Sequence, residues 1–69
     1  MKTAYENWIL QKARDLAQDE SEMEDFLAKI LAIECYNHNN MAFDIVEKAG
    51  DEFWNENTFK KAAKLLLNK

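Results

Sequence analysis

Proline is absent from this chain of 69 residues, and glycine occurs once, at Gly50. Both residues favour turns and interrupt helices, so a chain nearly without them has little of the turn chemistry that a β-sheet needs. No Asn-Gly or Asp-Gly pair, the strongest short-range hairpin signal, is present either. The chain is instead well supplied with Ala, Leu, Glu and Lys, which enter helices at little cost. We therefore expect an all-α fold.

Cysteine also occurs only once, at Cys35, which excludes an intramolecular disulfide and leaves too few thiolates for a structural zinc site. The longest apolar run is far shorter than the roughly 20 residues that span a bilayer. The polar start has no apolar stretch of signal-peptide length. We expect a cytoplasmic protein that has no cofactor, no metal and no membrane partner.

The small size limits the core. Residues 1–69 form one helical domain, and a chain of this length buries only about 60% of the surface that its unfolded form exposes. Without a disulfide or a metal, stability must come from helix packing, completed in some proteins by a second copy of the chain. The sequence leaves open whether the protein is a monomer or a homodimer.

Apolar residues recur at spacings of three and four in four segments, which is the period of an amphipathic helix. We predict helices over residues 3–18, 21–37, 40–49 and 56–68, packed as a compact bundle of about four short helices. The densest stripe lies in the second segment and is the expected spine of the core: Met23, Phe26, Leu27, Ile30, Leu31 and Ile33. The first segment presents Tyr5, Trp8, Ile9, Ala13 and Leu16 on one face.

Polar residues mark the predicted helix ends. Ser21 followed by Glu24 has the spacing of a capping box, in which each side chain bonds the backbone N–H of the other residue. Asn40 is the predicted cap of the third helix. Gly50 is expected to end that helix in the left-handed conformation that glycine adopts without steric cost.

The formal net charge of −4 is concentrated in residues 1–39, which carry eight acidic and four basic side chains. An acidic surface is repelled by phosphate, so we expect no direct binding to nucleic acid. Five acids, here called the acidic segment, lie within seven residues: Asp19, Glu20, Glu22, Glu24 and Asp25. Such a run is typical of a solvated helix start that the helix dipole stabilises. The other interpretation is a docking surface for a basic partner.

Phe53 and Trp54 are adjacent aromatic residues between the third and fourth predicted helices. Adjacent side chains diverge by about 100° on a helix and point to opposite sides of extended backbone. One small core can therefore hardly bury both rings, and one ring is a candidate surface anchor, since aromatic residues are enriched in protein interfaces. The alternative is a corner plug in which both rings cover gaps between helices.

Glu34 falls inside the apolar arc of the second predicted helix, and His38 follows four residues later, within reach if the helix continues. A buried carboxylate paired with an imidazole would suit acid–base chemistry. The alternative is that Glu34 lies at the helix end and bonds a loop N–H, the cap of a neighbouring helix or His38. Cys35 lacks the basic neighbours that activate a thiol, so we expect it to be packed.

These observations favour a non-catalytic module that binds and modulates another protein. Phe53 or Trp54 would be the apolar anchor, and the acidic segment would supply electrostatic complementarity.

Two other hypotheses stay open. The first is an acidic inhibitor that mimics nucleic acid, of the kind that bacteriophages encode against restriction or CRISPR proteins. It requires further acids in line with the acidic segment: Glu6, Asp15, Asp44 and Glu47. The second is a small enzyme or metal protein that uses Glu34 and His38.

Overall fold

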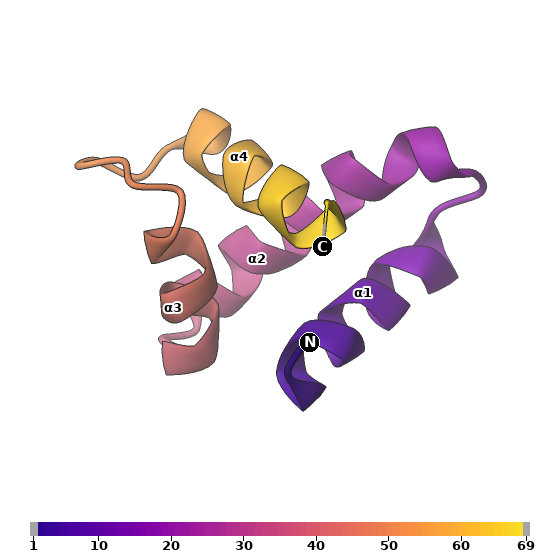
Figure 1. Ribbon diagram of the computed structural model, residues 1–69, viewed down its shortest axis with the longest axis horizontal. Helices are drawn as coiled ribbons and strands as arrows, with labels where there is room; N and C mark the ends of the chain where they lie inside the picture. The colour runs from indigo at the N-terminus through magenta and orange to yellow at the C-terminus, as the bar shows by residue number, and fades with distance from the viewer. Residues whose placement is uncertain (1, 69) are drawn as a thin grey trace.

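Four α-helices and one short 3-10 turn account for most of residues 2–68, the range that the computed structural model describes. The helices are α1 (Ala4–Leu16), α2 (Met23–Tyr36), α3 (Asn40–Glu47) and α4 (Glu56–Leu67), and the turn η1 (Glu20–Glu22) leads into α2 (Figure 1). No strand occurs within this range. The prediction of an all-α bundle is confirmed, and the predicted helix ends differ by up to two residues from those observed.

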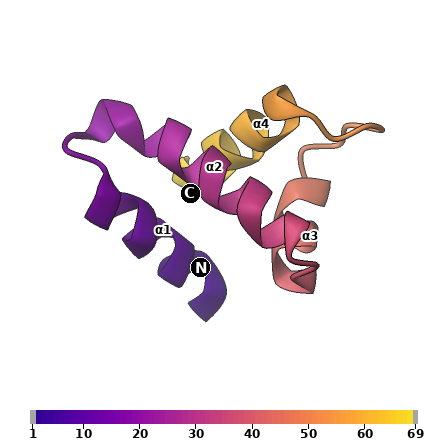
Figure 2. The same ribbon diagram turned by 180° about the vertical axis from the view of Figure 1, so that it is seen from behind.

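Helix α2 is the centre of the molecule, because each of the other helices packs against it, α4 most extensively and α1 next. Figures 1 and 2 show α1 and α4 on different sides of α2, with α3 at its C-terminal end. Helix α1 has few contacts with α3 or α4 and depends almost entirely on α2. Within residues 2–68, no helix has both the length and the apolar character to cross a bilayer.

The core lies where these helices meet, and α2 contributes more buried side chains than any other helix. The buried apolar residues are Ile9, Ala13, Met23, Leu27, Ala28, Leu31, Cys35, Ala42, Ile45, Val46, Ala62, Ala63 and Leu66. The predicted spine was wrong at Ile33, which is 58% exposed. The neighbouring helices cover two sides of α2, and Ile33 points to a third side. Trp8 and Leu16 are also exposed, since α1 has only one large neighbour.

The start of α2 differs from the prediction. Ser21 and Glu24 do not form a capping box, and the carboxylate of Asp19 instead accepts hydrogen bonds from the backbone N–H and hydroxyl of Ser21. The 3-10 turn η1 inserts between this cap and α2, so Ser21 lies within the turn, one residue before the N-cap position of α2, which is Glu22. A capping box does occur at α1, where Thr3 and Glu6 exchange hydrogen bonds of 2.7 and 3.1 Å.

Helix α3 is capped one residue earlier than predicted. Asn39, not Asn40, accepts the N–H of Met41 at 3.0 Å, because Asn40 is already within the helix. At the other end, Gly50 adopts φ of 79°, as predicted, and its N–H donates to the carbonyl of Glu47 at 3.0 Å.

Shortening a side chain should lower the free energy of unfolding much more on the buried side of α2 than on its exposed side. Leu31→Ala removes a fully buried side chain, and we expect it to lower the free energy of unfolding by about 2–5 kcal/mol. Ile33→Ala removes a similar apolar volume from the exposed side and is expected to change it by about 0.5 kcal/mol at most. Urea unfolding followed by circular dichroism measures both values. Equal losses in the two variants would contradict the packing described for α2.

Candidate functional site

The segment 51–55, here called the corner, is the second part of the loop 48–55 between α3 and α4 and carries the adjacent aromatic pair. Phe53 is 76% exposed, whereas Trp54 is 38% exposed. The indole of Trp54 lies with its centroid 5.8 Å from the ring of Phe43 and 6.4 Å from the ring of Phe59. Trp54 therefore closes the gap between α3 and α4, and Phe53 projects outward from the same loop. The structure combines the plug and the exposed ring in one pair of residues.

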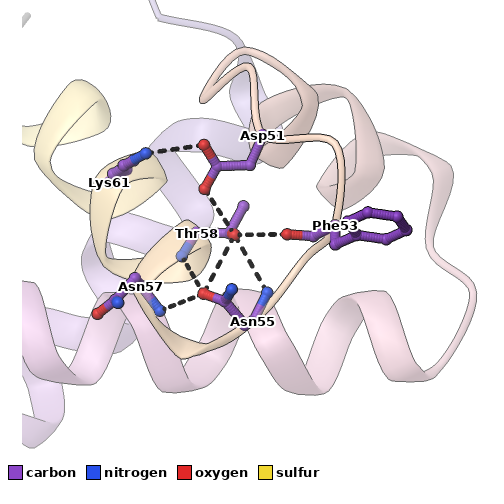
Figure 3. Close-up of polar contacts among 6 residues, drawn as sticks. All are labelled: Asp51, Phe53, Asn55, Asn57, Thr58 and Lys61. Atoms are coloured by element: carbon purple, nitrogen blue, oxygen red, sulfur yellow. Dashed lines mark hydrogen bonds and ion pairs between the residues drawn. The ribbon is translucent and has the colours of Figure 1, made fainter.

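A polar network around Thr58 positions the corner (Figure 3). The hydroxyl of Thr58 is fully buried, donates to Oδ2 of Asp51 at 2.8 Å and accepts the backbone N–H of Asn55 at 3.1 Å. The side chain of Asn55 completes the cap of α4 by accepting the backbone N–H groups of Asn57 and Thr58, at 2.9 and 3.2 Å. The chain on both sides of Phe53 is thus bonded to the first turn of α4, through Asp51 before it and Asn55 after it.

The carboxylate of Asp51 uses both oxygens, since Oδ1 lies 2.7 Å from the ammonium of Lys61 while Oδ2 accepts the Thr58 hydroxyl. The hydrogen bond from Lys61, and after it that from Thr58, hold the pKa of Asp51 below its usual value. Asp51 therefore stays ionised at neutral pH and keeps the loop attached to α4. The carbonyl oxygen of Phe53 lies 3.3 Å from the same hydroxyl, while its ring points away from the network (Figure 3).

Replacement of the Thr58 hydroxyl tests this network. Thr58→Val keeps the shape of the side chain but leaves the N–H of Asn55 and one oxygen of Asp51 without their buried partner. We expect a loss of about 1–3 kcal/mol in the free energy of unfolding. Thr58→Ser retains the hydroxyl and is the matched control, with a smaller loss. Urea unfolding of the three proteins gives the comparison, and a Val variant as stable as the Ser variant would exclude a structural role for the hydroxyl.

Three residues of the acidic segment have partners within the chain. Asp19 caps η1, Glu22 accepts the N–H of Gln18 at 2.7 Å, and a carboxylate oxygen of Glu24 lies 3.9 Å from the ammonium of Lys64. Glu20 and Asp25 are exposed and form no salt bridge within residues 2–68. The segment thus stabilises the turn between α1 and α2 and leaves two carboxylates directed to solvent.

Only part of the acidic segment lies far from the corner. The turn between α1 and α2 and the loop between α3 and α4 lie at opposite ends of the long axis of the molecule, which measures 32 × 23 × 23 Å (Figure 1). Glu24 and Asp25, in the first turn of α2, lie closer to the corner, since Glu24 lines a hollow with Asp51 and Asn55, and Asp25 lines another with Asn55. Glu6, Asp44 and Glu47 line a separate hollow beside the start of α1. The length of α1, about 20 Å for its 13 residues, separates that end of the molecule from the acidic segment.

Glu34 joins three helices instead of pairing with His38. Its Oε1 accepts the hydroxyl of Tyr5 from α1 and the side-chain amide of Asn39 from the cap of α3, each at 3.0 Å. Of the alternatives for Glu34, a bond to the cap of a neighbouring helix is therefore confirmed. His38 is exposed at φ of 62° and forms no hydrogen bond to Glu34 within the described part of the chain. The helix ends at Tyr36, so the spacing of four no longer brings the two side chains together.

The Tyr5 hydroxyl and the Cys35 thiol lie partly buried near Glu34, and both have raised pKa values. Burial, the hydrogen bond to Glu34 and the charge of that carboxylate all raise the pKa of Tyr5 well above its usual value. Burial, and secondarily the charge of Glu34, raise the pKa of the Cys35 thiol. Cys35 is packed in the core, as predicted, and its environment is the opposite of one that generates a reactive thiolate.

The raised pKa of Tyr5 predicts a change of stability at high pH. Above pH of about 10 the phenol ionises in the unfolded chain but stays protonated in the folded one, so ionisation favours unfolding. Tyr5→Phe lacks this group and is expected to be less stable near pH 7, by about 0.5–1.5 kcal/mol. The difference between the two proteins should shrink as the pH rises from 9 to 11. Parallel urea-unfolding stabilities across that range would contradict the burial of this hydroxyl.

Comparison with protein-family models, with curated proteins and with solved structures finds no match for this chain. Within residues 2–68, no three His, Cys, Asp or Glu side chains converge in an arrangement that could hold a metal ion. Function is therefore inferred from the surfaces that the fold presents.

Proposed function

We propose that this chain is a non-catalytic module that binds another protein through the corner, with Phe53 as the principal anchor and Trp54 beside it. The observation that carries the proposal is a large apolar ring, 76% exposed, on a loop whose backbone the Thr58 network fixes. An exposed ring on a held loop gains buried area on docking without a large cost for ordering the loop.

The shape of the corner supports this role. Trp54 stays packed against Phe43 and Phe59, so the base of the corner is rigid, while its exposed edge extends the apolar surface around Phe53. Aromatic side chains that insert into a partner's pocket commonly dominate interface energies. Such a contact acts by steric docking and needs no reactive group in the module.

In this proposal the acidic segment makes a second, electrostatic contribution. Glu20 and Asp25 are exposed and have no salt bridge within the described range. Exposed carboxylates outside the docked contact would raise the rate of encounter with a basic partner more than the strength of the final complex.

The nucleic-acid mimic has less support, because mimicry needs a continuous negative strip. Of the four further acids, Asp15 lies near the C-terminal end of α1, four residues before the acidic segment, whereas Glu6, Asp44 and Glu47 line the hollow beside the start of α1. The acids therefore fall into two groups that the length of α1 separates.

Capture of partners by truncated variants tests the proposal. Immobilised wild-type protein and Phe53→Ala are exposed to the same lysate of the host cell, and bound proteins are quantified by mass spectrometry. We expect a specific partner that the wild type retains and Phe53→Ala loses at least tenfold, equivalent to about 1.4 kcal/mol of binding energy.

Leu16→Ala is the matched control. Leu16 is also an exposed apolar residue, but it lies at the C-terminal end of α1 and not in the corner. Circular dichroism shows whether each variant remains folded. Capture that is equal for wild type and a folded Phe53→Ala variant would exclude the corner as the anchor.

A further inference from the structure

A groove of about 700 Å³ runs between the first turn of α1 and α3. Most of its lining is apolar: Ala4 and Tyr5 belong to α1, and Met41 and Ile45 belong to α3. A smaller hollow shares Ile45 with the groove and extends it toward α4. The groove exists because α1 packs on α2 and makes few contacts with α3 or α4.

The α3 wall has the pattern of a docking surface. Met41 and Ile45 are four residues apart and lie in one row along the helix. Met41 is 52% exposed although its neighbour in the row is buried. Asp44 and Glu47, three residues apart, form the acidic rim of this wall. A partner side chain can therefore meet an apolar row and two carboxylates on the same helix.

The rim carries more negative charge than the basic residue that lines the groove can compensate. Within residues 2–68 neither Asp44 nor Glu47 forms a salt bridge, whereas three other acids each have a lysine of α4 within 4 Å. Those pairs are Glu56–Lys60, Asp51–Lys61 and Glu24–Lys64. Lys48 is the single basic residue among those that line the groove. The N-terminus of α1 does not attract an anion here, because Thr3 and Glu6 cap each other.

We propose that this groove binds a basic amphipathic helix of a partner protein. The apolar face of that helix contacts Tyr5, Met41 and Ile45, and its Lys or Arg side chains lie beside Asp44 and Glu47. Amphipathic helices bind apolar grooves through side chains spaced three and four apart, and charges at the rim select the partner. The inference shares with the proposed function that the chain acts by binding protein, but it uses a different surface from the corner.

A second copy of the chain does not supply this helix. Its most basic segment is α4, whose lysines Lys60, Lys61 and Lys64 are paired with acids of the same chain. The apolar residues Ala62, Ala63 and Leu66 of α4 are buried in the core. The occupant therefore comes from another protein.

A designed peptide tests the groove without knowledge of the natural partner. The probe is a helical peptide of about 14 residues, four turns long, with Leu at helical spacing and Lys elsewhere. A peptide with Glu in place of Lys is its control. Binding is followed by amide chemical shifts of the ¹⁵N-labelled protein. We expect the Lys peptide to shift residues 4–6 and 41–48, and the Glu peptide to bind at least tenfold more weakly.

Two double variants separate local from overall charge. Asp44→Lys with Glu47→Lys reverses the groove rim, and Glu20→Lys with Asp25→Lys reverses the exposed acids at the far end. Each exchanges two acids for two lysines and so raises the formal net charge from −4 to zero. We expect about tenfold weaker binding of the Lys peptide for the rim variant and less than about twofold for the other. Met41→Ser, which keeps every charge, should also weaken binding.

Four results would overturn the inference, three of them from the peptide titrations. Those three are equal weakening by the two double variants, shifts centred on residues 19–25 or 51–55, and no binding of the Lys peptide at millimolar concentration. Groove resonances that move on dilution of the protein alone would show that a second copy occupies the groove, which also contradicts it. None of these results bears on the capture experiment with Phe53→Ala, so the failure of either proposal is recognised separately.

Discussion

The burial of α2 between α1 and α4 is the interaction on which the rest of this structure depends. The chain has a single cysteine and so no internal disulfide, and within residues 2–68 α2 is the one helix that packs extensively against each of the others. Because α1 and α4 cover different sides of α2 and scarcely touch each other, their outer flanks remain available. The groove beside α1 and the exposed side chain of Ile33 both follow from this arrangement.

Two groups of hydrogen-bonded side chains, here called polar joints, fix how the helices and loops lie around α2. At one joint Glu34 accepts hydrogen bonds from α1 and from the cap of α3, and so holds the two walls of the groove in register. At the other, Thr58 and Asp51 tie the loop after α3 to the first turn of α4. Buried polar groups that are fully satisfied tend to select one arrangement of helices among those that apolar packing alone would allow. Each joint lies next to one of the two proposed docking surfaces.

These surfaces differ in kind. The corner has a projecting ring, which in our proposal fits a pocket of the partner, whereas the groove is concave and acid-rimmed and is proposed to receive a partner's side chains. They flank α3 on different sides, since Phe43 contacts the corner while Met41 and Ile45 line the groove. If both proposals hold, a short chain with one core would have two separate contact surfaces and could bind two proteins at once or one extended partner.

The sequence by itself determined the helices, because the spacing of apolar residues, the scarcity of glycine and proline, and the conformation of Gly50 are local properties. It also indicated that Phe53 and Trp54 could not both be buried. The spacing of Asn55 and Thr58 is a capping signal that can be recognised in the sequence. The hydrogen bond from Thr58 to Asp51 could not be predicted in this way, since it depends on how the loop returns to α4. Only the tertiary structure decided that Glu34 bonds Tyr5 instead of His38, that Ile33 is exposed, and that Glu24 and Asp25 line hollows with residues of the corner. Each of these depends on which side of α2 a neighbouring helix covers, and a helical period carries no information about that choice.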